Sequence, residues 1–318
     1  LQYACQTRAN RRGDARSTRQ IEQPDQAARL SHKNKQRDDN SLHSTHIQRI
    51  ETNIGLSLMP KRTERQMPYT RDRHIFEIRG HDRAGFLQGL VTNDVSQTPQ
   101  ALTYSAILTP QGKFITDFFL FQDEKAIYMD VADSAAPALS TRLNMYKLRA
   151  EVTIDDSPLK VFCGTGSAPQ GAKSDPRDRS LGWRLYGERS GDDGSDWTAL
   201  RVAACIPAVT IELTADSYIL ENGFERLHGV DFKKGCYVGQ EITARMKHKA
   251  TLRKGLAQVR VDGKAPTGTD IVADGKNVGV LYSQSGGLGL AYLRFDRATD
   301  KMQAASARVR YATDQEQS

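Results

Sequence analysis

The segment K-G-C-Y-V-G-Q-E-I-T-A-R, which runs from Lys234 to Arg245, combines one cysteine with two glycines and several charged side chains. Cys236 directly follows Gly235, and Gly239 comes three residues later. Glycine at these positions permits a positive φ or a close approach of the backbone to a ligand. We therefore expect the cysteine to lie on an exposed corner of the chain.

A short helix is predicted directly after this corner, over residues 240–246. Glu241 and Arg245 have the i,i+4 spacing of a helical ion pair, which is worth about 0.3–0.5 kcal/mol when it is exposed. Backbone N–H groups at the start of a helix carry partial positive charge. The corner that holds Cys236 is therefore predicted to be electropositive.

The residues around this segment are mostly cationic, and Glu241 is the single acid among them. This composition suits an anionic ligand, although a solvated basic loop that closes a domain is an equally good interpretation. A positive potential would favour the thiolate of Cys236, whereas a buried thiol beside a glycine is the alternative. The spacing of His228 and His248 assigns neither of them as its base. The cations are Lys233, Lys234, Arg245, Lys247, Lys249, Arg253 and Lys254.

The string K-G-C-Y-V-G-Q-E-I-x-A-R resembles the signature of the YgfZ-type proteins. These are relatives of the glycine-cleavage T-protein that bind folate and assist the maturation of iron–sulfur clusters. Three further segments resemble the same family: G-H-D-R-A-G-F-L-Q-G-L-V-T-N-D-V from Gly80 to Val95, T-P-Q-G-K-F-I-T-D-F-F-L-F from Thr109 to Phe121, and the residues from Gly289 to Arg294. The likeness covers about residues 72–312.

This resemblance implies a tetrahydrofolate-binding accessory protein that supports the assembly or repair of iron–sulfur clusters in client enzymes, with Cys236 supplying a thiol. The implied partners are folate and iron–sulfur client enzymes or assembly factors. In the family a central cavity holds the folate, so Asn93 and Asp94 are expected to contact the pterin edge and the Lys234 region to face the glutamyl carboxylates. The residues that the resemblance assigns to the folate site are Asn93, Asp94, Asp117, Lys234, Tyr237, Gln240, Glu241 and Arg245.

One departure from the T-protein concerns the strand that follows Gly112. Where the T-protein carries two adjacent aspartates, one of them catalytic, this chain has Thr116 and Asp117. The missing carboxylate argues against aminomethyl transfer, so a folate-dependent aminomethyltransferase-type enzyme is the alternative function. Asp117 is alternatively an outward residue on a strand, and Asn93 and Asp94 are alternatively caps at a helix end.

The net charge of +7 is concentrated at one end of the 318 residues. Residues 1–66 have a balance of +6, which leaves +1 for residues 67–318. Electrostatic binding of nucleic acid requires a clustered basic face on the folded domain. We therefore expect no nucleic-acid partner, and a nucleic-acid-binding protein that uses the basic stretch 245–254 is the second alternative. No stretch approaches the ~18 apolar residues that span a bilayer, so no membrane partner is expected either.

The four cysteines, Cys5, Cys163, Cys205 and Cys236, are widely separated along the chain. Their spacing matches neither a structural metal site nor a disulfide framework, so no metal site and a reducing, cytoplasmic compartment are predicted. Cys163 and Cys205 lie among apolar residues and are predicted to be small core side chains.

Three regions are predicted along the chain. Residues 1–66 show no hydrophobic period and are expected to be a disordered leader or a misassigned extension that the fold does not need. A mitochondrial presequence, and hence the mitochondrial matrix, is the alternative, because this region contains several arginines, although aspartates oppose it. Residues 67–254 are expected to form a folate-binding body of the T-protein type, and residues 255–318 a C-terminal β-barrel.

Periodicity predicts an α+β body with an antiparallel sheet, followed by a small barrel of short strands. Residues 164–180 and 191–194 are expected to be variable connections rather than a site. Body strands are expected at 74–79, 102–108, 114–121, 126–131, 151–154 and 159–163, and helices at 134–149, 197–205, 215–226 and from Asp82 to residues 92–94. Barrel strands are expected at 256–261, 270–273, 278–283, 289–295 and 307–311.

Overall fold

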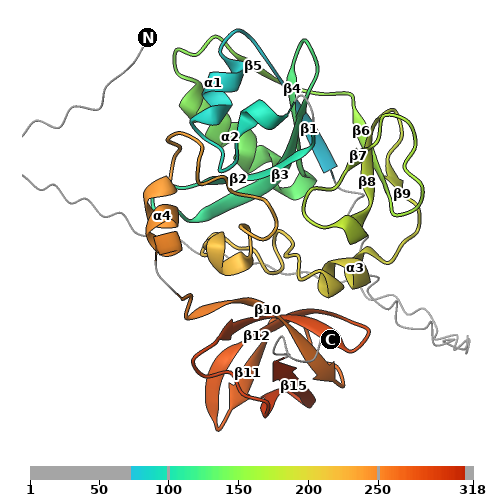
Figure 1. The fold of residues 1–318 in the computed structure, drawn as a ribbon, viewed down its shortest axis with the longest axis vertical. Helices are drawn as coiled ribbons and strands as arrows, with labels where there is room; N and C mark the ends of the chain where they lie inside the picture. The colour runs from blue at the N-terminus through green and yellow to red at the C-terminus, as the bar shows by residue number, and fades with distance from the viewer. Residues whose placement is uncertain (1–72, 99–100, 249–250, 312–318) are drawn as a thin grey trace, which may run out of the picture. The chain divides into compact units, whose positions relative to one another are not determined.

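The computed structural model describes residues 73–98, 101–248 and 251–311, which contain a five-stranded sheet, a four-stranded sheet and a closed β-barrel (Figure 1). The predictions for residues 1–66, including Cys5, and for Lys249 lie outside the described residues. Among the helices of the described ranges, none has the length and apolar character that crossing a membrane would require.

The five-stranded sheet is antiparallel, with the strand order β2-β3-β4-β1-β5. Tyr104 lies opposite Phe119 in its register, and Phe118 lies opposite Val131. The antiparallel sheet predicted from the alternating segments is therefore confirmed. Its strands are β1 (Arg73–Arg79), β2 (Thr103–Leu108), β3 (Phe114–Gln122), β4 (Ile127–Ala132) and β5 (Thr153–Asp156).

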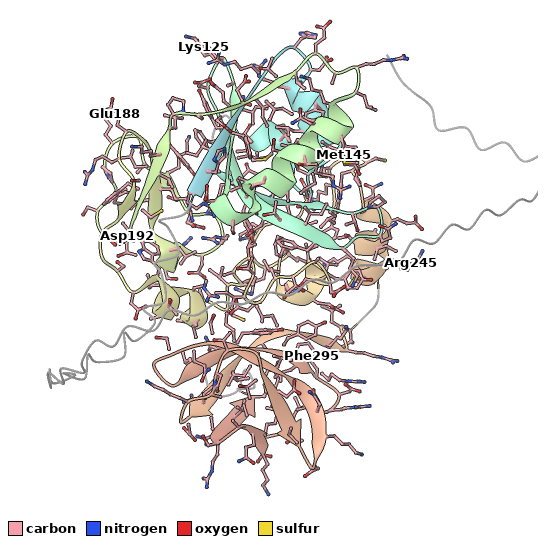
Figure 2. The ribbon with its side chains drawn as sticks, turned by 180° about the vertical axis from the view of Figure 1, so that it is seen from behind. Lys125, Met145, Glu188, Asp192, Arg245 and Phe295 are labelled. Atoms are coloured by element: carbon pink, nitrogen blue, oxygen red, sulfur yellow. The ribbon has the colours of Figure 1, made fainter. Side chains whose placement is uncertain are left out.

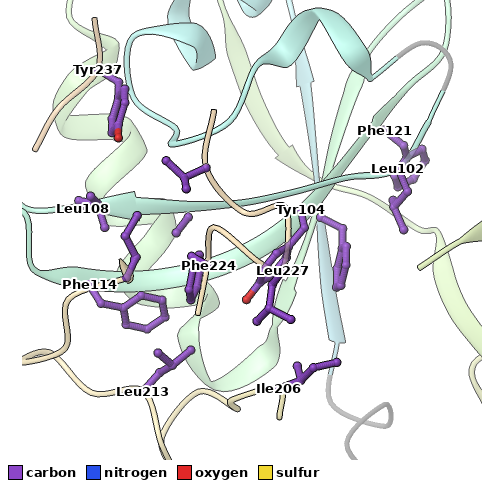
Figure 3. Close-up of a cluster of buried hydrophobic side chains, with 14 of the residues drawn as sticks. Leu102, Tyr104, Leu108, Phe114, Phe121, Ile206, Leu213, Phe224, Leu227 and Tyr237 are labelled. Carbon is purple, nitrogen blue, oxygen red and sulfur yellow. The ribbon is translucent and has the colours of Figure 1, made fainter. Parts of the chain in front are cut away.

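Both faces of this sheet are buried, each under a different part of the chain. Because side chains alternate along a strand, Phe118 packs on one face and Phe119 on the other. The first face packs against α1 (Arg83–Gln88) and α2 (Ala136–Lys147). The second face packs against residues 206–230, and Figure 3 shows Tyr104 and Phe224 within this core. Burial on both faces explains why β2, β3 and β4 are mostly apolar along their whole length.

Helix α1 is shorter than predicted. It ends at Gln88, whereas the sequence predicted a helix from Asp82 to residues 92–94. That prediction is wrong because Val91 leaves the helix and forms a bridge with Ile107. Asp82 does occupy the N-cap position, but its carboxylate accepts a hydrogen bond from Glu151 N at 2.9 Å rather than capping α1.

A four-stranded sheet follows in the chain, with the order β7-β8-β6-β9. Strands β7, β8 and β9 were not predicted. Strands β7 and β9 span two residues each and cannot show a period of 2. Residues 164–180, predicted to be a connection, contain the strand at Lys173–Ser174, and Asp175 and Arg177 near the end of this segment are buried. The strands are β6 (Lys160–Gly164), β7 (Lys173–Ser174), β8 (Trp183–Gly187) and β9 (Gly191–Asp192).

Three further helices were predicted in the body after β9, and the structure confirms those over 197–205 and 240–246, the second of which is described with the site below. Helix α3 (Trp197–Ala203) lies where a helix was expected. The helix predicted over 215–226 is wrong, since the segment contains only a 3₁₀ turn, η4 (Leu220–Asn222). The turn ends at Gly223 with a φ of 76°, the left-handed conformation that terminates helices.

The C-terminal part of the described chain forms a closed barrel with the strand order β10-β13-β12-β11-β14-β15. The predicted barrel is therefore confirmed, and β14 is the strand that the sequence did not indicate. Its strands are β10 (Lys254–Asp262), β11 (Thr269–Ala273), β12 (Lys276–Ser285), β13 (Leu288–Arg294), β14 (Met302–Ala304) and β15 (Ala307–Tyr311).

The barrel contacts the body through α3, which packs against β12 and β13. Arg201 of α3 donates hydrogen bonds to Glu212 Oε2 at 3.0 Å and to the hydroxyl of Ser283 on β12. Ser283 N in turn donates to Glu212 Oε1 at 3.3 Å. All three residues are buried, so a polar network without access to water joins the two parts.

Candidate functional site

The segment from Lys234 to Arg245 lies against the loop that follows α1. Val238 N donates a hydrogen bond to Gly89 O at 3.2 Å, and Asp231 N, just before the segment, donates to Thr92 O at 3.0 Å. Backbone hydrogen bonds therefore hold the Lys234–Arg245 segment against the segment from Gly80 to Val95, which also resembles the YgfZ-type family.

Gly239 brings the second of these segments, the turn between β2 and β3, into contact with the same region. Gly239 has a φ of +84°, and a Cβ there would lie 2.5 Å from Thr109 O. Gly112 in the turn has a φ of +72°, and its Cβ would lie 2.8 Å from Ile242 Cβ. Glycine is required at both positions by backbone conformation and by space. A Cβ at Gly235 would meet no atom within 4 Å.

Lys234 anchors the segment at the end of α1. Its ammonium donates to Gln88 O at 2.9 Å and to Val91 O, and it lies 4.9 Å from the centre of the Tyr237 ring. Gln88 is the last residue of α1, where carbonyl groups lack partners within the helix, and Val91 lies in the loop that follows. Burial lowers the pKa of Lys234 to about 8, with Asp94 among the opposing charges. The side chain expected to face glutamyl carboxylates is thus engaged with backbone oxygens.

Cys236 is exposed, as the sequence predicted, whereas Lys234 and Tyr237 on either side of it are held by the protein. Tyr237 is buried in the core on the second face of the five-stranded sheet, and its backbone N–H donates to Gln240 Oε1 at 3.2 Å. The chain therefore holds the thiol outward between an anchored lysine and a buried tyrosine. Of the two cysteines expected in the core, Cys163 is buried as predicted, whereas the prediction is wrong for Cys205, which is only half-buried. Burial raises the pKa of the Cys205 thiol to about 11.

Helix α4 (Gln240–His248) begins at Gln240 and presents its charged side chains to solvent. The predicted ion pair is present, with Arg245 Nη2 3.0 Å from Glu241 Oε1 and both side chains exposed. Figure 2 shows Arg245 at the rim of the body, directed away from the sheet. Lys247 pairs with Glu225 and also lies over the exposed ring of Phe232.

Asn93 and Asp94 lie in the loop between α1 and β2, where they organise the backbone. The Asn93 amide donates to Tyr104 O at 2.8 Å and to His228 O at 2.7 Å. The Asp94 carboxylate accepts from Ser96 N at 3.0 Å and also from the Ser96 hydroxyl and from Gln88. Hydrogen bonds from Ser96 lower the pKa of Asp94. Asp94 caps a 3₁₀ turn at its start, so the alternative of a helix C-cap is wrong for it.

Asp117 does not point outward from its strand, so that alternative is wrong. It is 5% exposed, and its carboxylate accepts a hydrogen bond from the Tyr104 hydroxyl at 2.6 Å. By alternation it shares the second sheet face with Phe119, and Thr116 faces the opposite side. The Arg177 guanidinium lies 5.4 Å from the Tyr104 ring centre and 4.7 Å from that of Phe119. The structure thus gathers a carboxylate, a phenol and a guanidinium on this face.

Arg177 belongs to a buried cluster of charged residues that links the five-stranded sheet to the four-stranded sheet. Arg177 binds Asp175 through two nitrogens at 3.0 and 2.8 Å, and Arg184 joins Asp175 to Asp130 with contacts of 3.2 Å. Arg73 also pairs with Asp130, at 2.6 Å. Burial opposes ionisation of Asp175, but Arg177 and Arg184 outweigh it and lower the pKa of its carboxyl group.

Sequence reasoning missed this cluster. Asp175 and Arg177 lie in a polar Gly/Ser/Pro stretch whose composition is that of a surface loop. The available signal was Asp130, a charge inside an apolar strand, because a buried charge requires a partner. The sequence could not indicate which residues supply it. In the described part of the chain, no group of three or more His, Cys, Asp or Glu residues is arranged to hold a metal ion.

The fold is of the T-protein type. The crystal structure of glycine cleavage system aminomethyltransferase T from Bartonella henselae matches with a TM-score of 0.61 and 12% identity, over 76% of this chain and 84% of that chain. The C-terminal β-barrel domain family of CAF17 matches residues 253–315.

Curated relatives narrow this class further. The chain is 30% identical to the human mitochondrial iron–sulfur cluster assembly factor IBA57 over 267 residues, which cover 70% of this chain and 75% of that protein. The mouse protein of the same name is 29% identical over 270 residues, with the same coverage. The chain belongs to the IBA57 family of iron–sulfur cluster assembly factors. The predicted kinship with iron–sulfur assembly proteins of T-protein fold is thereby confirmed.

Proposed function

We propose that this protein supports the assembly or repair of iron–sulfur clusters in client enzymes and that Cys236 provides the thiol that contacts the cargo. The observation that carries the proposal is the position of Cys236, which is exposed between the anchored Lys234 and the buried Tyr237. A thiolate binds iron and exchanges with sulfur species, whereas a buried thiol cannot reach either. The cluster is a substrate in this proposal rather than a resident cofactor.

The thiol role is tested by complementation of a strain that lacks this protein. Wild type and Cys205→Ala should restore aconitase activity, and Cys236→Ala should not. Cys205 is the matched control because it is only half-buried and its thiol has a pKa raised to about 11, which disfavours the thiolate. Melting temperatures of the purified variants establish that each folds. Full rescue by the folded Cys236→Ala protein would reject the thiol role.

We also propose that the body binds tetrahydrofolate, a carrier of one-carbon groups, on the second face of the five-stranded sheet. A pterin edge presents N–H donors that a carboxylate can accept, and Asp117 is the carboxylate on this face. The Tyr104 hydroxyl orients Asp117, and Arg177 borders both. Asn93 and Asp94 support the site through the backbone, because their side chains are engaged within the protein. The enzyme alternative has weaker support, since Thr116 supplies no second carboxylate.

Calorimetric titration tests folate binding separately from thiol chemistry. Cys236→Ser should bind tetrahydrofolate as wild type does, and Asp117→Asn should lose about 1–3 kcal/mol of binding free energy, the cost of an unmatched buried polar group. Absence of binding by wild type at millimolar ligand would remove the folate proposal and leave the thiol role standing.

We also propose that this protein is located in mitochondria, as its relatives are named. The human and mouse proteins are named mitochondrial, which supports the mitochondrial alternative over the cytoplasmic one. Microscopy of the full-length protein with a C-terminal fluorescent tag tests it. Uniform cytoplasmic fluorescence would favour the original expectation.

A further inference from the structure

A cavity of about 740 Å³ lies at the seam between the body and the barrel. It adjoins α4, the helix that begins in the segment around Cys236. Its described lining combines two apolar side chains and one hydroxyl group with three cations and one acid. These are Met246 and Leu252, Thr251, then Arg253, Lys254 and Arg294, and finally Glu221.

The acid at this cavity is already engaged within the protein. Glu221 Oε2 accepts a hydrogen bond from the Tyr292 hydroxyl and lies 3.9 Å from the Lys254 ammonium. Arg294 lies 3.6 Å from Asp296, but both side chains are 47% exposed and such pairs are weak. The cations therefore exceed the acids that line the cavity, and a ligand with several negative groups complements them.

A second cavity, at the barrel strands β11, β14 and β15, does not share the excess of cations over acids that lines the seam cavity. Its volume is about 790 Å³, close to that of the seam cavity. Its three cations face an equal number of acids among the described lining residues. These are Lys301, Arg308 and Arg310 against Asp262, Asp274 and Asp300.

The walls of the seam cavity are held in place by close contacts. A Cβ at Gly255 on β10 would lie 2.7 Å from Glu221 O and 3.3 Å from the Phe295 ring, so strand and turn touch directly. Figure 2 shows Phe295 on the side of the barrel that faces the body. The Tyr292 hydroxyl binds the Glu221 carboxylate beside this contact. The cationic side chains therefore project from a fixed frame.

The same short segment forms the seam and supports the proposed folate face. Glu221 in η4 lines the cavity, and Phe224, three residues later, stacks on Tyr104 with ring centres 5.2 Å apart (Figure 3). Tyr104 in turn donates to Asp117. We propose that the seam cavity binds the γ-glutamyl carboxylates of a folate polyglutamate chain, an inference that rests on the folate binding proposed above.

The chemistry of such a chain matches the lining. Each added glutamate brings one carboxylate. Arg253 and Arg294 offer cationic partners, and Lys254, beside Glu221, adds a third positive charge. Its methylene groups can pack on Met246 and Leu252. Lys234, by contrast, already donates its hydrogen bonds to backbone carbonyls.

The test compares 5-formyltetrahydrofolate carrying one glutamate with the form carrying five, by calorimetry on the full chain. Wild type should bind the pentaglutamate roughly tenfold more tightly, the gain expected from two or three surface ion pairs, and the gain should shrink as salt increases. The double variant Arg253→Gln/Arg294→Gln should lose the gain and keep the affinity for the monoglutamate. Arg308→Gln/Arg310→Gln makes the same charge change at the balanced cavity and should retain the gain.

Each other outcome overturns the inference in a recognisable way. Equal affinity of wild type for both forms would refute the seam site while folate binding stands. Loss of the gain in both double variants would show a general charge effect. Binding of an α-linked glutamate peptide at the seam, without a chain-length gain for folate, would assign the cavity to an acidic protein segment. Failure to bind either folate would remove the folate proposal and this inference together.

Discussion

Gly235 and Gly239, which lie on either side of Cys236, have opposite surroundings. Gly239 has a positive φ and presses against Thr109 O, whereas a side chain at Gly235 would extend into open space. Gly239 thus serves the docking of the segment on the body. Gly235 leaves the approach to Cys236 uncovered.

We expect Gly239→Ala to lower the free energy of unfolding by at least about 1–3 kcal/mol, because a non-glycine residue is strained at a φ of +84° and its Cβ has no room. Urea unfolding measures this change. Gly235→Ala is the matched control and should stay within about 0.5 kcal/mol of wild type. Equal stability of the two variants would mean that the segment does not dock as described.

Lys234 makes stability depend on pH, because burial lowers its pKa from 10.5 to about 8. Below pH 8 the lysine is protonated in both the folded and the unfolded state. Between about pH 8 and 10.5 the unfolded state holds the proton that the folded state has lost, so the contribution of Lys234 to stability rises with pH in this window.

The stability of wild type relative to Lys234→Met should therefore increase by roughly 1–3 kcal/mol from pH 7.5 to 10.5. Denaturant unfolding at several pH values measures the difference. Lys233→Met, at an exposed neighbouring position, corrects for the general effect of removing a charge. A difference that falls across this window would show that the lysine is stabilised in its charged form.

At the scale of elements, β4 and β8 meet through charges rather than through apolar side chains alone. Asp130 on β4 accepts from Arg73 on β1, and from Arg184 and the Tyr186 hydroxyl on β8. These carboxylate and guanidinium groups are buried, so each depends on its partners for compensation. The cluster fixes how the four-stranded sheet meets the five-stranded one.

Asp130→Asn should cost about 3–5 kcal/mol of stability, because it keeps the shape of the side chain while leaving buried guanidinium groups without their counter-charge. Thermal and urea unfolding provide the measurement. The control is Asp133→Asn, the same change three residues along at an exposed side chain. If both substitutions had the same small effect, the charge cluster would not contribute to stability.

At the scale of the whole molecule, the contact of barrel and body depends on a few buried polar groups. Arg201, Glu212 and Ser283 form a closed set of hydrogen bonds, and Gln258 of β10 adds bonds to Val202 O and Ala203 O. Loss of the arginine would leave Glu212 buried and uncompensated.

We expect Arg201→Met to separate the unfolding of the barrel from that of the body, so that one transition becomes two in differential scanning calorimetry. Arg226→Met is the control, because Arg226 donates to the nearby Ala204 O and Cys205 O within the body and does not reach the barrel. A single transition in Arg201→Met, at the wild-type temperature, would contradict the role of this network.

Local patterns were enough for much of the fold. The apolar runs of β1 to β4 and the stretches that form α2 and α3 are each visible within one element, so these elements could be predicted within a few residues. The exposed position of Cys236 and the ion pair of Glu241 with Arg245 were predictable for the same reason. Where an element is short or irregular, its prediction failed. Strands β7, β9 and β14 were not predicted, and the segment with the η4 turn was predicted as a helix.

The sequence by itself determined the family kinship, the α+β body with its barrel, and the cysteine on an exposed corner, because each depends on residues close together in the chain. Only the tertiary structure decided that Lys234 binds the carbonyls of Gln88 and Val91 and that Asp117 faces inward to Tyr104. It alone revealed the Asp175–Arg177 pair and the cationic seam. Such contacts join residues far apart in the chain, and composition cannot reveal which charge finds which partner once water is excluded.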